Sequence, residues 1–364
     1  MLRIACATAA AFALAATGCK RERSTEPGAA PSAGSAAEKS EAKTAGAVDP
    51  RIAALPGELW FLEDGEAHAL VRLRKGERLA VEGELYPSRT RLPDGRVVAI
   101  SSKGDGSPDS EQLVLVADDG TLTPVGPTAA KVRDPIAVSG TSIVATREVE
   151  GVTNLFALDV ASGEVAQLTD DPQGNFRPAS LGGDQIVFVS SRDGDAELYR
   201  GSARGGEVQR LTTFHKDDFE PVPSPDGATI AFQSDREGIA PRLFLVKPDG
   251  TELRRLTQLP SDAPEEEVEA AWSPDGKLLA YIRREGGEAV LVLHEVASGA
   301  ERVLTPAGLA DAEPAFSPDG AWIAVARGKA GGLGKTDVWA IPVAGGEPVQ
   351  VTTGAGTERL PRWF

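Results

Sequence analysis

The chain has 364 residues, with 54 acidic side chains against 38 basic ones and a formal net charge of −16. This balance disfavours nucleic acid as a partner, because affinity for phosphate backbones needs clustered Lys and Arg. A surplus of acidic residues is typical of a protein kept soluble by its charge.

Residues 1–18 are predicted to be an export signal. Arg3 supplies the positive start, and residues 4–16 form an apolar stretch that is too short to span a bilayer. The following Ala16-Thr17-Gly18-Cys19 resembles a bacterial lipobox, which implies cleavage before Cys19 and lipidation of its thiol. The alternative is an ordinary secretory signal with an incidental cysteine. Because Cys6 lies inside the signal, the mature chain would contain no disulfide.

The segment after the anchor is predicted to be a disordered tether covering residues 19–57. Residues 20–47 contain no Val, Ile, Leu, Met or aromatic side chain, so they bury too little apolar surface to offset their ordering entropy. Lys20 stands where an Asp would favour retention at the inner membrane. We therefore expect the chain at the periplasmic face of the outer membrane, held by its lipid anchor alone.

A repeat of about 44 residues dominates the rest of the chain. Its clearest copies contain Ser-Pro-Asp-Gly, as at residues 224–227, 273–276 and 317–320. Proline, aspartate and glycine in this order favour a hairpin turn, and an alternating β run follows each turn. The six turn glycines are spaced 43 to 49 residues apart: Gly95, Gly140, Gly183, Gly227, Gly276 and Gly320. This period, built from short strands, predicts a β-propeller.

The two ends of the repeat region are predicted to share one blade. Residues 59–64, 69–74 and 77–81 read as three strands of a unit that lacks its first strand, and residues 360–364 match that strand. Closing the ring in this way leaves no long exposed sheet edge. The sequence thus predicts an all-β protein whose residues 58–364 form a seven-bladed β-propeller of four-stranded antiparallel blades, with six blades as the alternative.

The repeat resembles that of TolB-like propellers. The usual copy of that family has Ser-Pro-Asp-Gly, a Ser-x-Arg-x-Gly turn, a Leu-Tyr strand and a Leu-Thr end. The copy at 177–212 matches with Ser190, Arg192, Leu198-Tyr199 and Leu211-Thr212. TolB itself carries a separate α/β domain and six blades, which this chain does not match, so the resemblance implies the fold and only by analogy an association with an envelope partner.

Acidic residues gather before three consecutive turns. Glu220, Glu269 and Glu313 each lie seven residues before a turn glycine, and Asp217 and Asp218 precede the first of them. We expect these residues in loops around the mouth of the channel, where they form a negatively charged surface for a polar or cationic partner. Solvated loops without a ligand are the alternative.

Two functions remain open at this stage. The favoured one is a monomeric, non-catalytic module that binds an envelope protein or cell-wall material, with no cofactor. The other is a propeller hydrolase or lyase that acts on a carbohydrate or lactone with a divalent cation such as Ca²⁺. The chain has only three histidines, of which His215 alone is predicted to lie in a mouth loop, and it has no G-x-S-x-G motif.

Overall fold

The computed structural model describes residues 49–65, 68–103, 110–331, 334–354 and 356–364. The predicted export signal and the predicted lipidation site Cys19 lie outside these residues. The described segments belong to one compact unit that covers residues 47–364. Among them, no helix has the length and apolar character needed to cross a membrane.

The described residues form an all-β structure in which strands pair into four-stranded antiparallel units, here called blades. The strands form five sheets, of which three have four strands, one has seven and one has eight. Dividing the seven-stranded sheet at β7 and the eight-stranded sheet between β22 and β23 gives four-stranded units, which are numbered below in order around the ring. The closing blade combines the two ends of the region: β27 (Thr357–Trp363), β1 (Glu58–Asp64), β2 (His68–Arg74) and β3 (Glu77–Glu82).

The other blades follow in chain order. The second and third share the long strand β7, whose first half pairs with β6 and whose second half pairs with β8. Their strands are β4 (Leu85–Arg91), β5 (Val97–Ser102), β6 (Glu111–Val116), β7 (Leu122–Ala137), β8 (Ser142–Val149), β9 (Val152–Asp159) and β10 (Val165–Gln167).

The fourth and fifth blades are separate sheets of four strands each. They consist of β11 (Asn175–Gly182), β12 (Gln185–Ser190), β13 (Glu197–Ser202) and β14 (Gln209–Arg210), followed by β15 (Asp218–Pro223), β16 (Ile230–Ser234), β17 (Arg242–Val246) and β18 (Arg254–Arg255).

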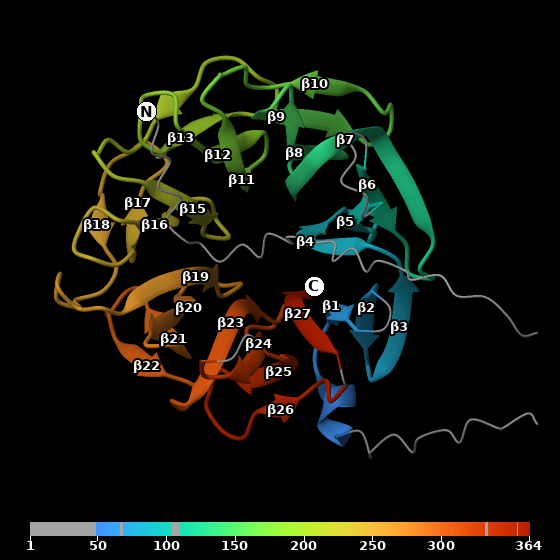
Figure 1. Ribbon diagram of the computed structural model, residues 1–364, viewed down its shortest axis with the longest axis vertical. Coiled ribbons are helices and arrows are strands. Elements are labelled where there is room, and N and C mark those ends of the chain that lie inside the picture. The colour runs from blue at the N-terminus through green and yellow to red at the C-terminus, as the bar shows by residue number, and fades with distance from the viewer. Residues whose placement is uncertain (1–48, 66–67, 104–109, 332–333, 355) are drawn as a thin grey trace, which may run out of the picture. The chain divides into compact units, whose positions relative to one another are not determined.

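The sixth and seventh blades touch through one parallel residue pair between β21 and β23. They consist of β19 (Glu266–Trp272), β20 (Leu278–Glu285), β21 (Glu288–Glu295) and β22 (Glu301–Val303), followed by β23 (Leu309–Phe316), β24 (Trp322–Lys329), β25 (Asp337–Pro342) and β26 (Val349–Gln350). The blades are arranged in a ring, with β4, β11, β15, β19, β23 and β27 around the centre and β3, β10, β18, β22 and β26 at the rim (Figure 1).

The Ser-Pro-Asp-Gly turns have the predicted chemistry. At Ser224-Pro225-Asp226-Gly227, the Asp226 carboxylate accepts hydrogen bonds from the Ser224 hydroxyl (2.6 Å) and the Ala228 amide (3.0 Å). Gly227 has a φ of +67°, and a Cβ there would lie 2.1 Å from the carbonyl oxygen of Leu181. The turn therefore requires glycine for both its backbone conformation and the close approach of the neighbouring blade.

The predicted pairing of the two ends is confirmed. β27 runs antiparallel to β1, with Leu59 opposite Trp363 and Asp64 opposite Thr357. Glu58 and Phe364 also exchange backbone hydrogen bonds of 2.8 and 2.9 Å. The first and last strands of the propeller thus complete one sheet.

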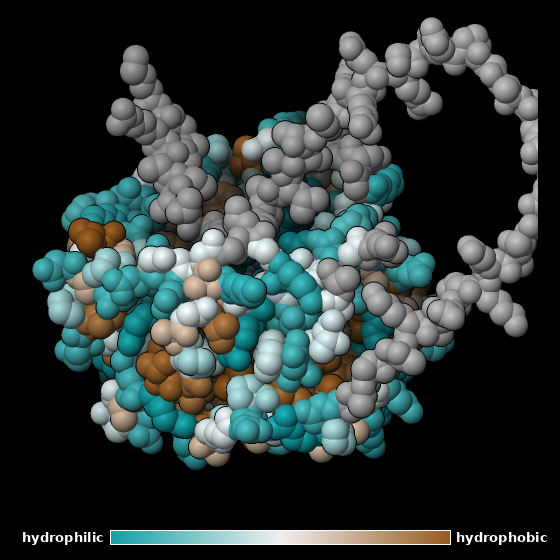
Figure 2. All heavy atoms as spheres, turned by 60° about the horizontal axis from the view of Figure 1, so that its bottom comes forward, coloured by the Kyte–Doolittle hydropathy of each residue, from teal (hydrophilic) through white to brown (hydrophobic). Residues whose placement is uncertain are grey.

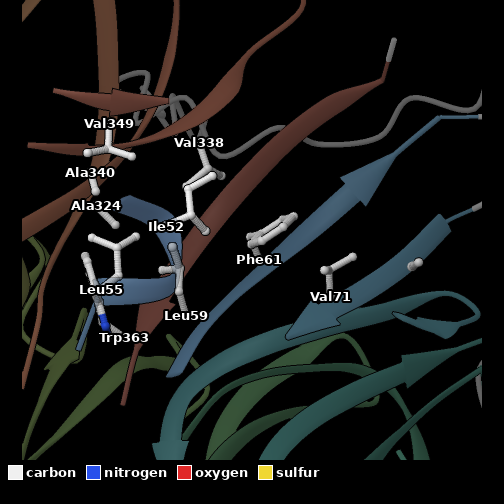
Figure 3. Close-up of a cluster of buried hydrophobic side chains, with 11 residues drawn as sticks. Ile52, Leu55, Leu59, Phe61, Val71, Ala324, Val338, Ala340, Val349 and Trp363 are labelled. Atoms are coloured by element: carbon white, nitrogen blue, oxygen red, sulfur yellow. The ribbon is translucent and has the colours of Figure 1, made fainter. Parts of the chain in front are cut away.

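A short 3₁₀-helix, η1 (Pro50–Ala54), packs onto this closing blade. Its Ile52, followed by Leu55, joins a buried cluster with Leu59 and Trp363, which also receives Val338 and Val349 from the seventh blade (Figure 3). The Trp363 indole donates to the Pro56 carbonyl oxygen at 2.5 Å. The tether was predicted to extend to residue 57, but residues from Pro50 onward are already part of the folded structure. Burial of Ile52 and Leu55 contributes about 1.5 to 3 kcal/mol each, which offsets the entropy lost when this segment is ordered.

The outer surface offers few large apolar side chains. The part of the surface in Figure 2 is largely hydrophilic, with hydrophobic residues in smaller separate areas. Among described residues, the exposed large hydrophobic side chains belong to four different blades: Val149, Phe176, Ile239, Leu253 and Val303. Scattered apolar residues of this kind are normal on a soluble surface.

Candidate functional site

The three predicted glutamates lie in inner strands and not in mouth loops. Glu220 is in β15, Glu269 in β19 and Glu313 in β23. Their expected equivalence is nevertheless visible, because each has the same backbone conformation, with φ between +51° and +58°. Their side chains therefore belong to the wall of the central channel, the space that the inner strands border, and not to an acidic loop surface.

The positive φ marks a β-bulge that recurs around the channel. In β15 the pairing with β16 shifts register between Phe219 and Val222, on either side of Glu220. The bulge adds a residue to the strand and turns its side chain away from the regular alternation. Six inner strands contain a non-glycine residue with positive φ at this place, and a proline follows all of them except Glu269: Asp134, Arg177, Glu220, Glu269, Glu313 and Leu360.

The bulge residues connect neighbouring blades by hydrogen bonds. The Glu269 carboxylate accepts a hydrogen bond of 2.6 Å from the backbone N–H of Glu313. The Glu313 carboxylate in turn accepts one of 2.5 Å from the backbone N–H of Leu360. Arg284 also forms an ion pair with Glu269. These carboxylates therefore stabilise the ring from within.

On the opposite arc, a cation occupies the same bulge position. Arg177 donates to Asp134 at 2.9 Å and its Nε lies 3.0 Å from a Glu220 carboxylate oxygen. Burial lowers the pKa of Arg177, but the two carboxylates outweigh that effect and leave the pKa above its ordinary value. The predicted negative charge at Glu220 is thus compensated by an arginine of the preceding blade.

The channel raises the pKa of two of its carboxyl groups. Burial raises the pKa of Glu220 and of Glu313, and this effect is opposed by Arg177 at the first and by Arg362 at the second. Solvent still reaches 32% of the Glu220 side chain, so the group lies deep in an open channel and not in a dry core. The cause is desolvation by the surrounding strands, which disfavours the charged form.

The prediction that Asp218 binds a partner is wrong, because its side chain is fully buried. It accepts a 2.5 Å hydrogen bond from Ser234 and forms an ion pair with Arg236, both in its own blade. Asp217, just before β15, accepts a 2.9 Å hydrogen bond from the Ala196 amide of the previous blade. Both aspartates therefore hold the strand in place.

Several inner strands have a buried acidic residue two positions before the bulge residue. In some blades this acid forms an ion pair with an arginine, but in the closing blade it does not. In β23, Asp311 forms a two-point ion pair with Arg327, with distances of 2.6 and 3.0 Å. In β27, Glu358 stands opposite Glu63 in the register of β1. Burial raises the pKa of Glu358 to about 7, and the Asp337 and Glu63 carboxylates contribute to this rise.

A cavity of about 410 Å³ opens at the end of the channel formed by the Ser-Pro-Asp-Gly turns. Its apolar walls come from β15, β19, β23 and β27, and include Trp272, Phe316 and Trp363. Trp272 is fixed by a 2.8 Å hydrogen bond from its indole to the Val222 carbonyl oxygen. The volume is in the range of pockets that hold small ligands.

Two arginines supply the charged side chains of this cavity. Arg89 of β4 and Arg362 of β27 line it together with the apolar residues. Neither arginine was predicted from the sequence to be a site residue. A recurring X-Pro pair was the available signal: it follows the bulge residue in five inner strands, the last of which contains Arg362, but it is missing after Glu269.

Other predicted features lie apart from this centre. His215 is exposed in the connection before β15, as expected. Within the described residues, no group of three or more His, Cys, Asp or Glu side chains has an arrangement suited to holding a metal ion. The carboxylates that could attract a divalent cation already accept hydrogen bonds or ion pairs from the protein.

A family model described as the TolB beta propeller domain matches residues 153–364, which is more than half of the chain. The chain belongs to the TolB beta propeller domain family. This membership agrees with the resemblance of the repeat and with the ring of four-stranded blades.

Known proteins similar to this TolB-type propeller have diverse descriptions. The uncharacterized peptidase YuxL of Bacillus subtilis is 34% identical over 29% of this chain, and the match spans only 21% of that protein. The crystal structure of TolB from Acinetobacter baumannii superposes with a TM-score of 0.55 at 20% identity, covering 85% of this chain and 68% of that one. An oligogalacturonate lyase in complex with manganese has a TM-score of 0.60 at 15% identity, with coverages of 83% and 87%. These structural likenesses show the fold alone.

Proposed function

We propose that this protein is an exported, lipid-anchored, non-catalytic propeller that binds another component of the cell envelope through its central channel. The observation that carries the proposal is the cavity at the turn end of the channel, with its apolar walls and two arginines. Aromatic and arginine side chains are enriched at protein-binding surfaces, where they fill well-packed pockets.

The hydrogen bonds and ion pairs of the channel carboxylates favour a binding role over a catalytic one. Glu269 and Glu313 accept hydrogen bonds from backbone amides, and Glu220 is paired with Arg177. A general acid or base needs a proton-accepting group that is free to reach the substrate. The hydroxyl among the lining residues, Ser317, donates to Asp319 at 2.6 Å and so belongs to its turn.

Export and anchoring rest on residues 1–19 of the sequence. We propose that the signal is removed before Cys19, that the thiol is acylated and that the propeller resides at the periplasmic face of the outer membrane. Labelling of growing cells with radioactive palmitate is expected to mark the protein. Cys19→Ser is expected to lose the label and to leave the membrane fraction, and retention of the label in that variant would exclude this anchor.

Site-specific crosslinking tests the channel as the binding site. A photoreactive phenylalanine analogue replaces Ala315, which lines the cavity, or Ala300, which is exposed in the hairpin before β22 at the rim. Irradiated cells are expected to yield a covalent adduct with an envelope protein from position 315 and not from position 300.

A channel-filling variant provides the control for specificity. Ala315→Trp adds a large side chain inside the cavity and is expected to abolish the interaction with the crosslinked protein, whereas Ala300→Trp adds the same side chain at the rim and is expected to preserve it. Equal crosslinking from both positions, or an interaction unaffected by Ala315→Trp, would place binding elsewhere on the molecule.

A further inference from the structure

The cavity at the turn end of the channel combines apolar walls with cations that have few partners. Arg89 forms no hydrogen bond or ion pair with any described residue. Arg362 donates from Nη1 to the Pro361 carbonyl oxygen at 2.9 Å, and its Nε has no partner in the described part of the chain. Most of the N–H donors of the two guanidinium groups are therefore unused by the protein.

The two cations lie close enough to repel each other. Burial lowers the pKa of Arg362 to about 10, and the charge of Arg89 is the next contribution to that decrease. Glu313 and Glu269 attract Arg362 from deeper in the channel, but neither is within ion-pair distance of it. Arg89 is exposed to solvent, whereas Arg362 is desolvated and has no ion-pair partner among the described residues. An anion bound beside Arg362 would offset part of the cost of burying its charge.

This arrangement contrasts with the other channel arginine. Arg177 is held between Asp134 and Glu220 at 2.9 and 3.0 Å, so both sides of its guanidinium group are occupied. Arg89 and Arg362 instead line a cavity whose other lining residues are all apolar except Ser317. A guanidinium group presents paired N–H donors that match the two oxygens of a carboxylate.

We propose that the cavity binds a peptide segment that carries a carboxylate next to apolar side chains, with the carboxylate between Arg89 and Arg362. The apolar side chains of the peptide contact Trp272, Phe316 and Trp363. The choice of a peptide rests on the proposed function, in which the partner is an envelope protein. The aromatic walls provide the apolar contact area, and the arginines provide the preference for an anion.

Nuclear magnetic resonance of the tryptophan indoles tests this ligand class directly. The chain has five tryptophans, of which Trp272 and Trp363 line the cavity while Trp60 is buried between the closing and second blades. The probes are acetyl-Leu-Phe with a free carboxylate, the same dipeptide as its carboxamide, and inorganic phosphate.

The free carboxylate is expected to shift the Trp272 and Trp363 indole signals and to leave the Trp60 signal in place. The carboxamide is expected to bind at least tenfold more weakly, because it cannot form charge-assisted hydrogen bonds with the arginines. Equal shifts from both dipeptides would overturn the assignment, as would phosphate binding as tightly as the free carboxylate, since the site would then select a small ion.

Arginine variants locate the carboxylate. Arg89→Met is expected to weaken binding of the free dipeptide about tenfold or more, and Arg362→Met to do the same. Arg96→Met is the matched control, because Arg96 lies beside a turn at the same end of the propeller and pairs with Asp94 at 2.6 Å outside the cavity. An affinity unchanged by Arg89→Met, in a variant with an unchanged thermal transition, contradicts the proposal.

The outcome separates the ligand class from the binding function. If the arginine variants retain the adduct at position 315 and the free dipeptide does not bind, the ligand class is wrong although the channel still binds a partner. If position 315 yields no adduct but the dipeptide binds through the arginines, the peptide site stands and the proposed envelope partner fails.

Discussion

Replacing Glu358 with Gln is expected to stabilise the folded chain at pH 8 by about 3 kcal/mol and to have little effect at pH 4.5. Glu358 is fully buried in β27. Its Oε2 accepts a 3.1 Å hydrogen bond from Thr352, but Oε1 has no hydrogen-bond partner among the described residues, and neither has Oδ1 of the nearby Asp337. Two carboxylates cannot hydrogen-bond to each other unless one is protonated.

The magnitude follows from the pKa. The pKa of Glu358 rises from an ordinary 4.5 to about 7 through burial and the carboxylates of Asp337 and Glu63. At 1.36 kcal/mol for each pKa unit, ionisation of Glu358 disfavours the folded state by about 3 kcal/mol. Because the folded-state pKa is the higher one, stability is lost as pH rises from 4.5 to 7, and the loss is complete above 7.

The assay is urea unfolding of the purified chain and of Glu358→Gln between pH 4.5 and 8. The Gln amide is neutral at every pH, keeps an acceptor for Thr352 and gains a donor toward Asp337. The difference in free energy of unfolding between variant and wild type is therefore expected to grow from about 0.5 to about 3 kcal/mol as pH rises. A difference that does not depend on pH would refute this reasoning.

Asp311 provides the matched control, because it occupies the equivalent position of β23 and has an arginine partner. Asp311→Asn removes the charge that Arg327 binds at 2.6 and 3.0 Å. Leaving that arginine unpaired is expected to destabilise the fold by about 3 kcal/mol throughout the same pH range. The two variants therefore have opposite effects at pH 8 although both neutralise a buried acid.

Three further perturbations test other parts of the structure. Deleting residues 360–364 removes most of the closing strand and is expected to lower the thermal transition by about 10 °C or more, whereas an unchanged transition would contradict the closure. Arg177→Met leaves Asp134 and Glu220 without their shared cation and is expected to cost about 2 kcal/mol in urea unfolding, against less than about 0.5 kcal/mol for the exposed Arg204→Met. Millimolar Ca²⁺ or Mn²⁺ is expected to move the thermal transition by less than about 1 °C, because the channel carboxylates are already paired. A rise of several degrees that Glu220→Gln removes would instead indicate a metal site.

The strands and the closure could be predicted because their signals are local. The β run predicted after the turn at 224–227 is present as β16 (Ile230–Ser234), and the predicted strands at 59–64 and 77–81 agree with β1 and β3 to within one residue at each end. Alternation and turn glycines act on neighbouring residues, so each copy of the repeat indicates its own hairpins. Comparison of residues 360–364 with the first strands of the other copies was then enough to identify them as the strand that the first unit lacks.

The placement of the acids could not be predicted in the same way. Glu220 and Asp218 are two residues apart in β15, yet one lines the channel and the other is buried against Ser234 and Arg236. The bulge at Glu220 decides this, since one inserted residue changes which side chains face the channel. Acidic composition alone therefore suggested a charged loop surface where the structure has paired charges in inner strands.

The sequence by itself determined a ring of β hairpins closed by its two ends, because turn chemistry and alternation are properties of short segments. Only the tertiary structure decided which charges lack partners. Arg89 and Arg362 are separated by more than 270 residues in the chain, and they become neighbours in one cavity only when β27 takes its place beside β1. Whether a charged side chain has a partner depends on residues that are far apart in the sequence and close in the fold, and a local sequence pattern contains no information about such contacts.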